Sequence, residues 1–258
     1  RYYALFMEMG TGKSKVAIDT LALLYEDKRI NAAFIVAPKG VYDNWVKGEI
    51  PAHLPDHINR SVVRWTPSTA KWFQNEMKTI VYNTFDGLKI FVMNIEALST
   101  PRGMKAAHIY LTKNPSNMMI VDESTTIKNR KATRTKNIIN LGEEAFYRRI
   151  LTGSPITKSP MDLFSQCIFL SERALGFKSY YAFQSTYALV KRKVMGARSF
   201  QEIVGYRRLN ELNSKLENFS NRILKEECLD LPDKVYMRRD ITLSDEQQKA
   251  YSEMKTNA

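Results

Sequence analysis

Two glycines, a lysine and a serine stand near the start of the chain in the order that a phosphate-binding loop requires. Gly10 and Gly12 follow a short apolar run and precede Lys13, Ser14 and a helical pattern. Glycines allow positive φ and let successive N–H groups surround a phosphate, and a helix N-terminus adds its positive dipole end. We expect the Lys13 ammonium to reach the β- and γ-phosphates of a nucleotide and the Ser14 hydroxyl to bind Mg²⁺. The predicted nucleotide-binding residues are Met9, Gly10, Thr11, Gly12, Lys13 and Ser14.

This loop departs from the full phosphate-loop pattern at one position. Met7 stands five residues before Gly12, where the pattern has another glycine. The alternative interpretation is therefore a glycine-rich turn between a strand and a helix that carries an exposed lysine. A nucleotide site needs further groups elsewhere in the chain, and two candidates are present.

A pair of acids follows an apolar run near the middle of the chain. Residues 118–121 are Met, Met, Ile and Val, and Asp122 and Glu123 come next, so both carboxylates are expected at the carboxyl end of a buried strand, where open parallel sheets bind ligands. Nucleotide hydrolysis needs an acid that holds Mg²⁺ and a group that activates water. We predict Asp122 as a Mg²⁺ ligand beside Ser14, and Glu123 and Lys13 as the catalytic residues. The alternative is that the acids only cap the following turn.

Hydroxyl groups follow another predicted strand. Thr152, Gly153 and Ser154 come directly after the apolar end of residues 147–151. Hydroxyls at the end of a neighbouring strand can hydrogen-bond the acidic pair and report the state of the γ-phosphate, so we assign these three residues a coupling role. A plain exit from strand to turn is the alternative.

The elements that must position these groups alternate along the chain. Apolar runs predict strands over residues 32–37, 61–65, 89–93, 118–121 and 147–151, and helical patterns cover residues 15–25, 68–81, 103–111, 132–141 and 160–170. Continuous rather than alternating apolarity suits strands covered on both faces. Strands that alternate with helices at this spacing predict an α/β fold with a mainly parallel sheet flanked by helices.

The character of the sequence changes after residue 171. We predict residues 1–171 as the nucleotide-binding lobe, residues 172–230 as a mainly helical protrusion, and residues 231–258 as a strand (235–243) and a helix that lead onward. Ser244 and Gln247 have the spacing of a capping box and should begin that helix. The aromatic residues between 180 and 187 could stack on bases, but their helical spacing favours a core position.

Charge and composition restrict the function classes. The formal net charge of the 258 residues is +12, which points to a polyanionic partner, although a solvated basic face is the alternative. No apolar run reaches the roughly 18 residues of a membrane span. Cys167 and Cys228 stand alone, so we expect two reduced core thiols in a protein of the cytoplasm or, in a eukaryote, the nucleus.

Taken in order, the motifs resemble those of the helicase-like ATPases of superfamily 2 and, within it, the Swi/Snf-type group. The segment 8–14 resembles D-E-M-G-L-G-K-T, where the strict first glycine is also missing, and Asp122 to Asn129 match D-E-A-H-R-I-K-N at five of eight positions. The other similar segments are 35–38 followed by Asn44, Trp45 and Glu49, then 92–98, 151–156, 231–234, 243–244 and 247–251. The resemblance covers nearly the whole chain.

The resemblance implies a RecA-like first motor lobe with a helical protrusion, which binds ATP and Mg²⁺ and moves along duplex DNA without reading its sequence. It also implies which residues meet the DNA, on the lobe face opposite the nucleotide entrance: Pro38, Lys39, Asn94, Lys128 and Asn129. The family's arginine finger belongs to a second RecA-like lobe, which is the expected intramolecular partner. An arginine finger is worth about 10³ to 10⁵ in rate, so these residues alone should hydrolyse ATP poorly.

One departure from the family pattern concerns coupling. Ser124 and Thr125 stand where the family has Ala-His, so the usual histidine link from the acids to the 151–156 segment is either absent or rebuilt from hydroxyls. Two rival functions remain open. The first is a non-catalytic nucleic-acid-binding module with a vestigial nucleotide site. The second is a small-molecule kinase, which the basic charge and the 151–156 segment disfavour.

Overall fold

The computed structural model describes residues 1–82, 85–195, 198–228, 230 and 237–256. The chain divides into two compact units, Arg1–Cys228 and Leu229–Ala258. The predicted site residues all belong to the first unit. No helix in the described part of the chain is long and apolar enough to cross a membrane.

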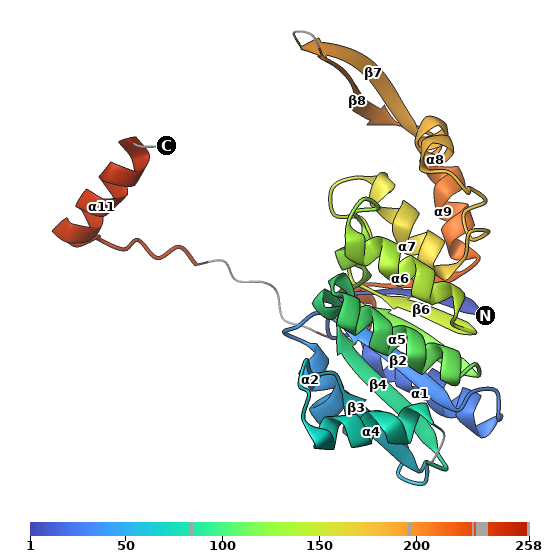
Figure 1. Cartoon of the computed structure of the whole chain (residues 1–258). Helices are drawn as coiled ribbons and strands as arrows, with labels where there is room; N and C mark the ends of the chain where they lie inside the picture. Colours follow the sequence, from blue (N-terminus) through green and yellow to red (C-terminus); the bar gives the residue numbers. More distant parts are fainter. Residues whose placement is uncertain (83–84, 196–197, 229, 231–236, 257–258) are drawn as a thin grey trace. The chain divides into compact units, whose positions relative to one another are not determined.

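A seven-stranded parallel sheet forms the centre of the first unit (Figure 1). Its strand order is β3-β4-β2-β5-β6-β1-β9, and every neighbouring pair is parallel. The strands are β1 (Tyr2–Met7), β2 (Ala32–Ala37), β3 (Arg60–Arg64), β4 (Leu88–Asn94), β5 (Asn117–Asp122), β6 (Tyr147–Leu151) and β9 (Ser220–Ile223). The predicted parallel α/β architecture is therefore confirmed.

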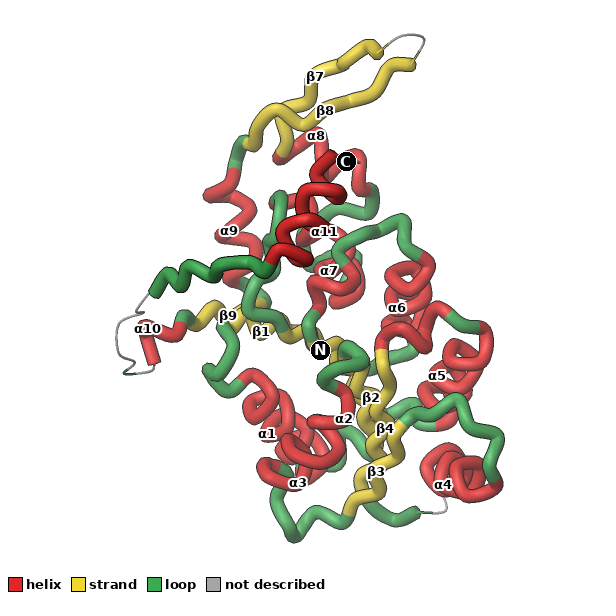
Figure 2. The backbone as a smooth tube through the Cα atoms, turned by 90° about the vertical axis from the view of Figure 1, so that its left-hand side faces the viewer, coloured by secondary structure: helices red, strands yellow, loops and turns green. Residues whose placement is uncertain are grey.

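Helices cover both faces of this sheet, which explains why its central strands are continuously apolar. All six residues of β2 are buried. Phe34 packs with the cluster beneath α4 (Lys71–Val81), α5 (Pro101–Lys113), α6 (Thr133–Glu143) and α7 (Leu163–Leu170), whereas Ile35 packs with the cluster beneath α1 (Lys13–Glu26) and α3 (Ile50–His53). Figure 2 shows α1 and α3 on one side of the strands and α4, α5 and α6 on the other.

The prediction of a mainly helical protrusion is wrong for its middle part. The structure has α8 (Tyr180–Tyr187) and α9 (Leu209–Glu217), but an antiparallel hairpin of β7 (Ala188–Met195) and β8 (Arg198–Tyr206) lies between them. The β-branched residues of both strands favour extended backbone, a signal that the basic residues between them obscured. The hairpin extends away from the sheet (Figure 1).

The chain then returns to the sheet, so the expected boundary at residue 171 does not separate a domain. β9 pairs with β1 in parallel, with Ala4 beside Ser220 and Met7 beside Ile223. α10 (Lys225–Cys228) follows, and Cys228 is exposed there, whereas Cys167 in α7 is buried. The prediction of a core thiol is therefore confirmed for Cys167 and wrong for Cys228.

The second unit contains the predicted C-terminal helix, α11 (Asp245–Thr256). Its capping box forms as predicted: the Ser244 amide donates to the Gln247 side chain at 3.2 Å, and the Gln247 amide donates to Ser244 Oγ at 3.4 Å. The strand predicted over residues 235–243 is not formed by residues 237–243. Residues 235 and 236 lie outside the described residues.

Candidate nucleotide and magnesium site

The loop between β1 and α1 has the backbone of a phosphate-binding turn. Gly10 and Gly12 have φ of +87° and +90°, and α1 begins directly after Gly12. A Cβ at either glycine would meet nothing within 4 Å. Conformation rather than crowding therefore requires glycine here, because side chains disfavour the left-handed region.

The Glu8 carbonyl oxygen organises this loop. Lys13 Nζ donates to it at 3.0 Å, and Thr11 Oγ1 donates to it at 2.7 Å. The Glu8 side chain accepts from the Lys225 amide at 2.8 Å, and the Glu8 amide donates to the Ile223 carbonyl at 3.0 Å. The end of β9 and the start of α10 thus fix the position at which the phosphate loop leaves the sheet.

Strand register brings the acidic pair to the same edge of the sheet as this loop. β6 lies between β1 and β5, and Leu151 of β6 pairs with both Leu5 and Asp122. The phosphate loop begins two residues beyond this level, after Met7. Burial raises the pKa of Asp122 overall, and the positive charge of Lys13 makes the smallest of the contributions that oppose this rise.

Asp122 is buried and held at both carboxylate oxygens. Oδ1 accepts from the Glu123 amide at 2.9 Å, and Oδ2 accepts from Trp45 Nε1 at 2.8 Å. Trp45 begins a π-helical turn, Trp45–Glu49, and its side chain is fully buried. Burial raises the pKa of the Asp122 carboxyl above its ordinary value, and the Trp45 hydrogen bond opposes that shift.

These residues fit a magnesium ion that arrives with a nucleotide. Among the described residues, no group of three or more His, Cys, Asp or Glu could hold a metal by itself. Mg²⁺ often binds to one or two protein oxygens together with substrate phosphates and water. The Ser14 hydroxyl at the start of α1 and the Asp122 carboxylate at the end of β5 supply that kind of oxygen.

Glu123 adopts a backbone conformation that is unusual for its type and is held there by hydroxyl groups. Its φ and ψ are +48° and +61°, a region that costs a side-chain-bearing residue about 1–2 kcal/mol. Thr125 Oγ1 donates to Glu123 Oε1 at 2.8 Å, and Thr152 Oγ1 donates to the same oxygen at 3.0 Å. Thr126 Oγ1 donates to the Glu123 carbonyl at 2.8 Å.

A second, buried path joins the two segments. Ser124 Oγ donates to Gln166 Oε1 at 2.7 Å, and Gln166 Nε2 donates to the Pro155 carbonyl at 2.8 Å. Together with Thr152, this path connects residues 123–125 to residues 152–155 through side-chain hydroxyls and one amide. We expected the link that a histidine makes in the family to be either absent or rebuilt from hydroxyls. In this structure the link is built from the hydroxyls of Ser124, Thr125 and Thr152.

The segment after β6 also contacts the phosphate loop. A Cβ on Gly153 would lie 3.3 Å from the Met7 carbonyl oxygen and 3.3 Å from Glu8 Cα, so the backbones approach closely at this glycine. The Ser154 amide donates to Thr152 Oγ1 at 3.2 Å. Of the three residues predicted to couple the acids to the nucleotide, Thr152 therefore contacts Glu123 and Gly153 lies against the start of the phosphate loop.

The five residues predicted to meet DNA form a row along the carboxyl ends of β4, β2 and β5. Pro38 and Lys39 follow β2, Asn94 ends β4, and Lys128 and Asn129 come after β5. We call these residues the edge row. Asn94, Pro38 and Lys39 stand at the carboxyl ends of parallel strands, as the phosphate loop does, and β5 and β6 separate those strands from β1. Lys39 is exposed.

Two further members of the edge row are engaged with neighbouring side chains. Lys128 Nζ donates to Thr157 Oγ1, and Asn94 Nδ2 donates to Glu96 Oε2 at 3.2 Å. The aromatic residues of α8 differ in burial. Phe183 and Tyr187 are buried, which confirms the core interpretation for them, while Tyr181 is 65% exposed.

Two residues of the site have no role in the sequence-based assignment. Trp45 appears there only as part of a resembling segment, and Gln166 does not appear. Gln166 is fully buried in α7, where most neighbours are apolar. A lone amide in an apolar helix is a usable sequence signal, because a buried polar group needs a hydrogen-bond partner. Its partner could not be identified without the fold.

Comparisons with known proteins agree with this architecture. The model of the SNF2-related domain matches residues 4–258. DNA annealing helicase and endonuclease ZRANB3 of Bos taurus is 30% identical over 234 residues, covering 90% of this chain and 20% of the relative. Helicase-like transcription factor of Mus musculus is 26% identical over 242 residues, covering 88% and 21%. The chain thus spans about one fifth of the length of these curated relatives.

A solved structure shares the fold. The SWI2/SNF2 ATPase core of Sulfolobus solfataricus in complex with double-stranded DNA superposes with a TM-score of 0.60 at 22% identity, covering 99% of this chain and 47% of that one. The resemblance seen in the motifs is confirmed, because the family model spans the same segments. The chain therefore belongs to the SNF2-related domain family.

Proposed function

We propose that this chain is the first motor lobe of an ATP- and Mg²⁺-dependent DNA translocase. The observation that supports the proposal is the strand order β5-β6-β1, in which the acidic pair and the phosphate loop follow parallel strands separated only by β6. Family membership supports a helicase-like ATPase. The net charge of +12 supports a polyanionic track.

Each side chain has a defined task in this proposal. Lys13 and the loop amides would hold the β- and γ-phosphates, and Ser14 and Asp122 would hold a magnesium ion, whose charge would offset the negative charge of the phosphates. Glu123 accepts a proton from the attacking water. Thr125 and Thr152 both donate to Glu123 Oε1, which fixes the carboxylate and leaves Oε2 to meet the water.

The hydroxyl contacts also provide a route from chemistry to movement. Thr152 joins Glu123 to the segment after β6, and Lys128 of the edge row donates to Thr157 in that same segment. A change in the γ-phosphate state that alters Glu123 would therefore reach Lys128, a proposed DNA contact, through these two hydrogen bonds and the backbone between Thr152 and Thr157. The edge row would bind phosphates of duplex DNA, which gives affinity without sequence choice.

Two substitutions in the full-length protein test the proposal. Lys13→Ala should weaken nucleotide binding and remove ATP hydrolysis, and Glu123→Gln should retain binding while it removes DNA-stimulated ATP hydrolysis. Survival of hydrolysis in both variants would refute the motor assignment. If the parent protein binds DNA but never hydrolyses ATP, it is instead a nucleic-acid-binding module with a vestigial nucleotide site. The 258 residues alone should hydrolyse ATP poorly, because the second lobe is expected to supply the arginine finger.

A further inference from the structure

The hairpin of β7 and β8 (residues 188–206) carries charge that the proposed motor chemistry does not use. It contains four basic residues and one acidic residue. Three of the basic residues are consecutive and exposed, namely Lys191, Arg192 and Lys193, and we call them the cation triplet. The hairpin extends away from the sheet as a two-stranded ribbon (Figure 1).

Because side chains alternate across a strand, the triplet places positive charge on both faces of this ribbon. Lys191 and Lys193 lie on one face, where Lys193 pairs with Glu202 at 2.9 Å. Arg192 lies on the other face, and its Nη2 donates to Ser199 Oγ at 3.2 Å. The Lys193 side chain remains 59% exposed in its ion pair, so water and a ligand can both reach it.

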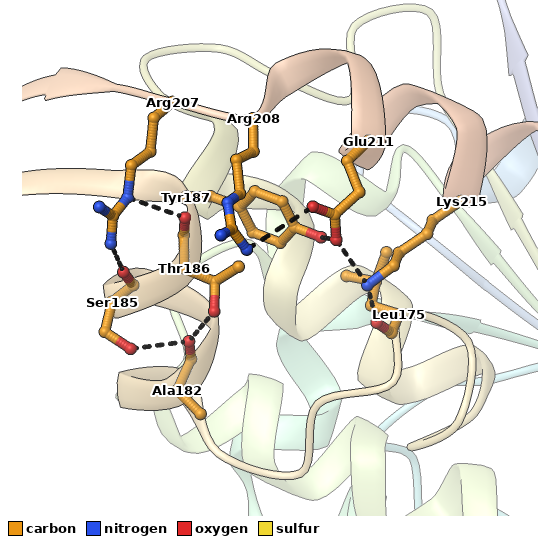
Figure 3. Close-up of polar contacts among 9 residues, drawn as sticks. All are labelled: Leu175, Ala182, Ser185, Thr186, Tyr187, Arg207, Arg208, Glu211 and Lys215. Carbon is orange, nitrogen blue, oxygen red and sulfur yellow. Dashed lines mark hydrogen bonds and ion pairs between the residues drawn. The ribbon is translucent and has the colours of Figure 1, made fainter.

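The base of the hairpin is fixed to α8 and α9 (Figure 3). Arg207 donates through Nε to the Thr186 carbonyl at 3.1 Å and through Nη2 to the Ser185 carbonyl, both in the last turn of α8. Tyr187 Oη donates to Glu211 at 3.0 Å, and Lys215 pairs with Glu211 at 3.2 Å. The charge of Arg207 is thus used to attach the ribbon, which distinguishes it from the cation triplet.

We propose that the β7–β8 hairpin is a second DNA contact, in which the cation triplet binds phosphates from within a groove of the duplex. A major groove about 12 Å wide admits a two-stranded ribbon. Cations on both ribbon faces can then reach both phosphate backbones. The eight residues of β7 span about 26 Å at 3.3 Å per residue, which is long enough to place the triplet in the groove. This inference rests on the proposed DNA-binding function.

The salt dependence of DNA binding tests the hairpin contact. Lys191→Gln, Arg192→Gln and Lys193→Gln are combined in the 258-residue chain, and its affinity for a fluorescent mixed-sequence duplex is measured at several salt concentrations. The slope of log K against log salt is negative, and each lost phosphate contact reduces its magnitude by about 0.9, so the magnitude should fall by about 2.7. The affinities of variant and wild type should converge at high salt.

A matched control separates direct contact from the overall charge of the protein. Lys71→Gln, Lys78→Gln and Lys113→Gln remove the same net charge from exposed positions on α4 and α5 and should leave the slope near the wild-type value. Lys191→Arg with Lys193→Arg should also keep it, which shows that the hairpin tolerates substitution. Equal slopes in the triplet and control variants overturn the hairpin contact.

The result also separates the hairpin from the motor lobe itself. If Lys39→Gln with Lys128→Gln weakens DNA binding and the triplet variant does not, the edge row stands and the hairpin contact fails. If the wild-type chain shows no salt-dependent binding to duplex DNA, the DNA-binding function fails, and the hairpin inference fails with it.

Discussion

Two regions differ in how strongly their surroundings constrain them. One is the sheet edge that carries the phosphate loop, Asp122 and Glu123, which we call the nucleotide edge, and the other is the protruding hairpin. At the nucleotide edge, Asp122 is buried, and both of its carboxylate oxygens accept hydrogen bonds from the protein. At the hairpin base, Glu211 makes comparable polar contacts, but its side chain is 43% exposed. Water can replace a lost partner at Glu211 and cannot readily do so at Asp122, so equal chemical changes should have unequal effects in the two regions.

The largest expected difference concerns hydrolysis. Glu123→Gln in the full-length protein should lower the DNA-stimulated ATPase rate by about 10² to 10⁴, the range for loss of a general base. Glu202→Gln, an equivalent change on the hairpin, should leave the rate per bound enzyme close to that of wild type. Steady-state ATPase assays at saturating DNA measure both. Comparable losses in the two variants would show that Glu123 has no special role.

A difference in stability should follow from removal of one hydrogen-bond donor in each region. Trp45→Phe leaves a buried carboxylate oxygen of Asp122 without its indole partner, at a cost of about 1–3 kcal/mol in the free energy of unfolding. Tyr187→Phe removes a donor to the partly exposed Glu211 and should cost about 0.5 kcal/mol. Urea unfolding of the 258-residue chain measures both values, and a larger loss for Tyr187→Phe would reverse the comparison.

Glycine-to-alanine substitutions compare how strongly each region requires a backbone conformation that only glycine adopts readily. Gly12→Ala forces a side chain into φ of +90° and should cost about 1–2 kcal/mol of stability and weaken nucleotide binding. Gly205 in β8 has an ordinary φ, and an added Cβ would meet Leu189 Cδ1 at 3.4 Å, which is normal contact. Gly205→Ala should therefore change stability by less than about 0.5 kcal/mol. Thermal unfolding distinguishes them, and equal effects would contradict the proposed strain at Gly12.

The smallest expected effects are opposite pH dependences. Burial raises the pKa of Asp122, so the contribution of this carboxyl to the free energy of unfolding is favourable at low pH and is lost as pH rises through the folded-state pKa. The hydrogen bond from Lys215 lowers the pKa of Glu211. The stabilisation that the ionised Glu211 gives to the folded state is therefore present above the ordinary Glu pKa and is lost as pH falls through the lowered value.

Variants with an uncharged amide in place of each carboxyl test the direction of these two pH dependences. Asp122→Asn should gain stability relative to wild type as pH rises, whereas Glu211→Gln should gain stability relative to wild type as pH falls. Unfolding titrations across acidic pH measure both differences. Parallel pH profiles for the two variants would show that the burial difference does not control these carboxylates.

The same contrast explains which features were predictable from the sequence. A strand covered on both faces, such as β2, must be apolar throughout, so its pattern is clear. The residue type of Gly10 and Gly12 indicates that both positions have positive φ. The hairpin has a solvated surface, which tolerates Lys191 to Lys193 among strand-forming residues, so local composition masks its structure.

The missed parts of the site depend on contacts between distant segments. Trp45 lies 77 residues from Asp122, and Ser124 lies 42 residues from Gln166. Residue type and spacing within one motif carry no information about such pairs. Only the fold brings them together, although the isolated amide of Gln166 and the hydroxyls at 124 and 125 indicate that partners are needed.

The magnesium dependence of nucleotide binding tests the central claim most directly. Affinity of the 258-residue chain for a fluorescent ATP analogue is measured with Mg²⁺ and with a chelator, in wild type, Lys13→Ala and Asp122→Asn. We predict that Lys13→Ala weakens binding under both conditions, and that Asp122→Asn removes most of the enhancement that Mg²⁺ gives to wild type. An Asp122→Asn variant that keeps the full enhancement would contradict a shared metal–phosphate centre at this edge of the sheet.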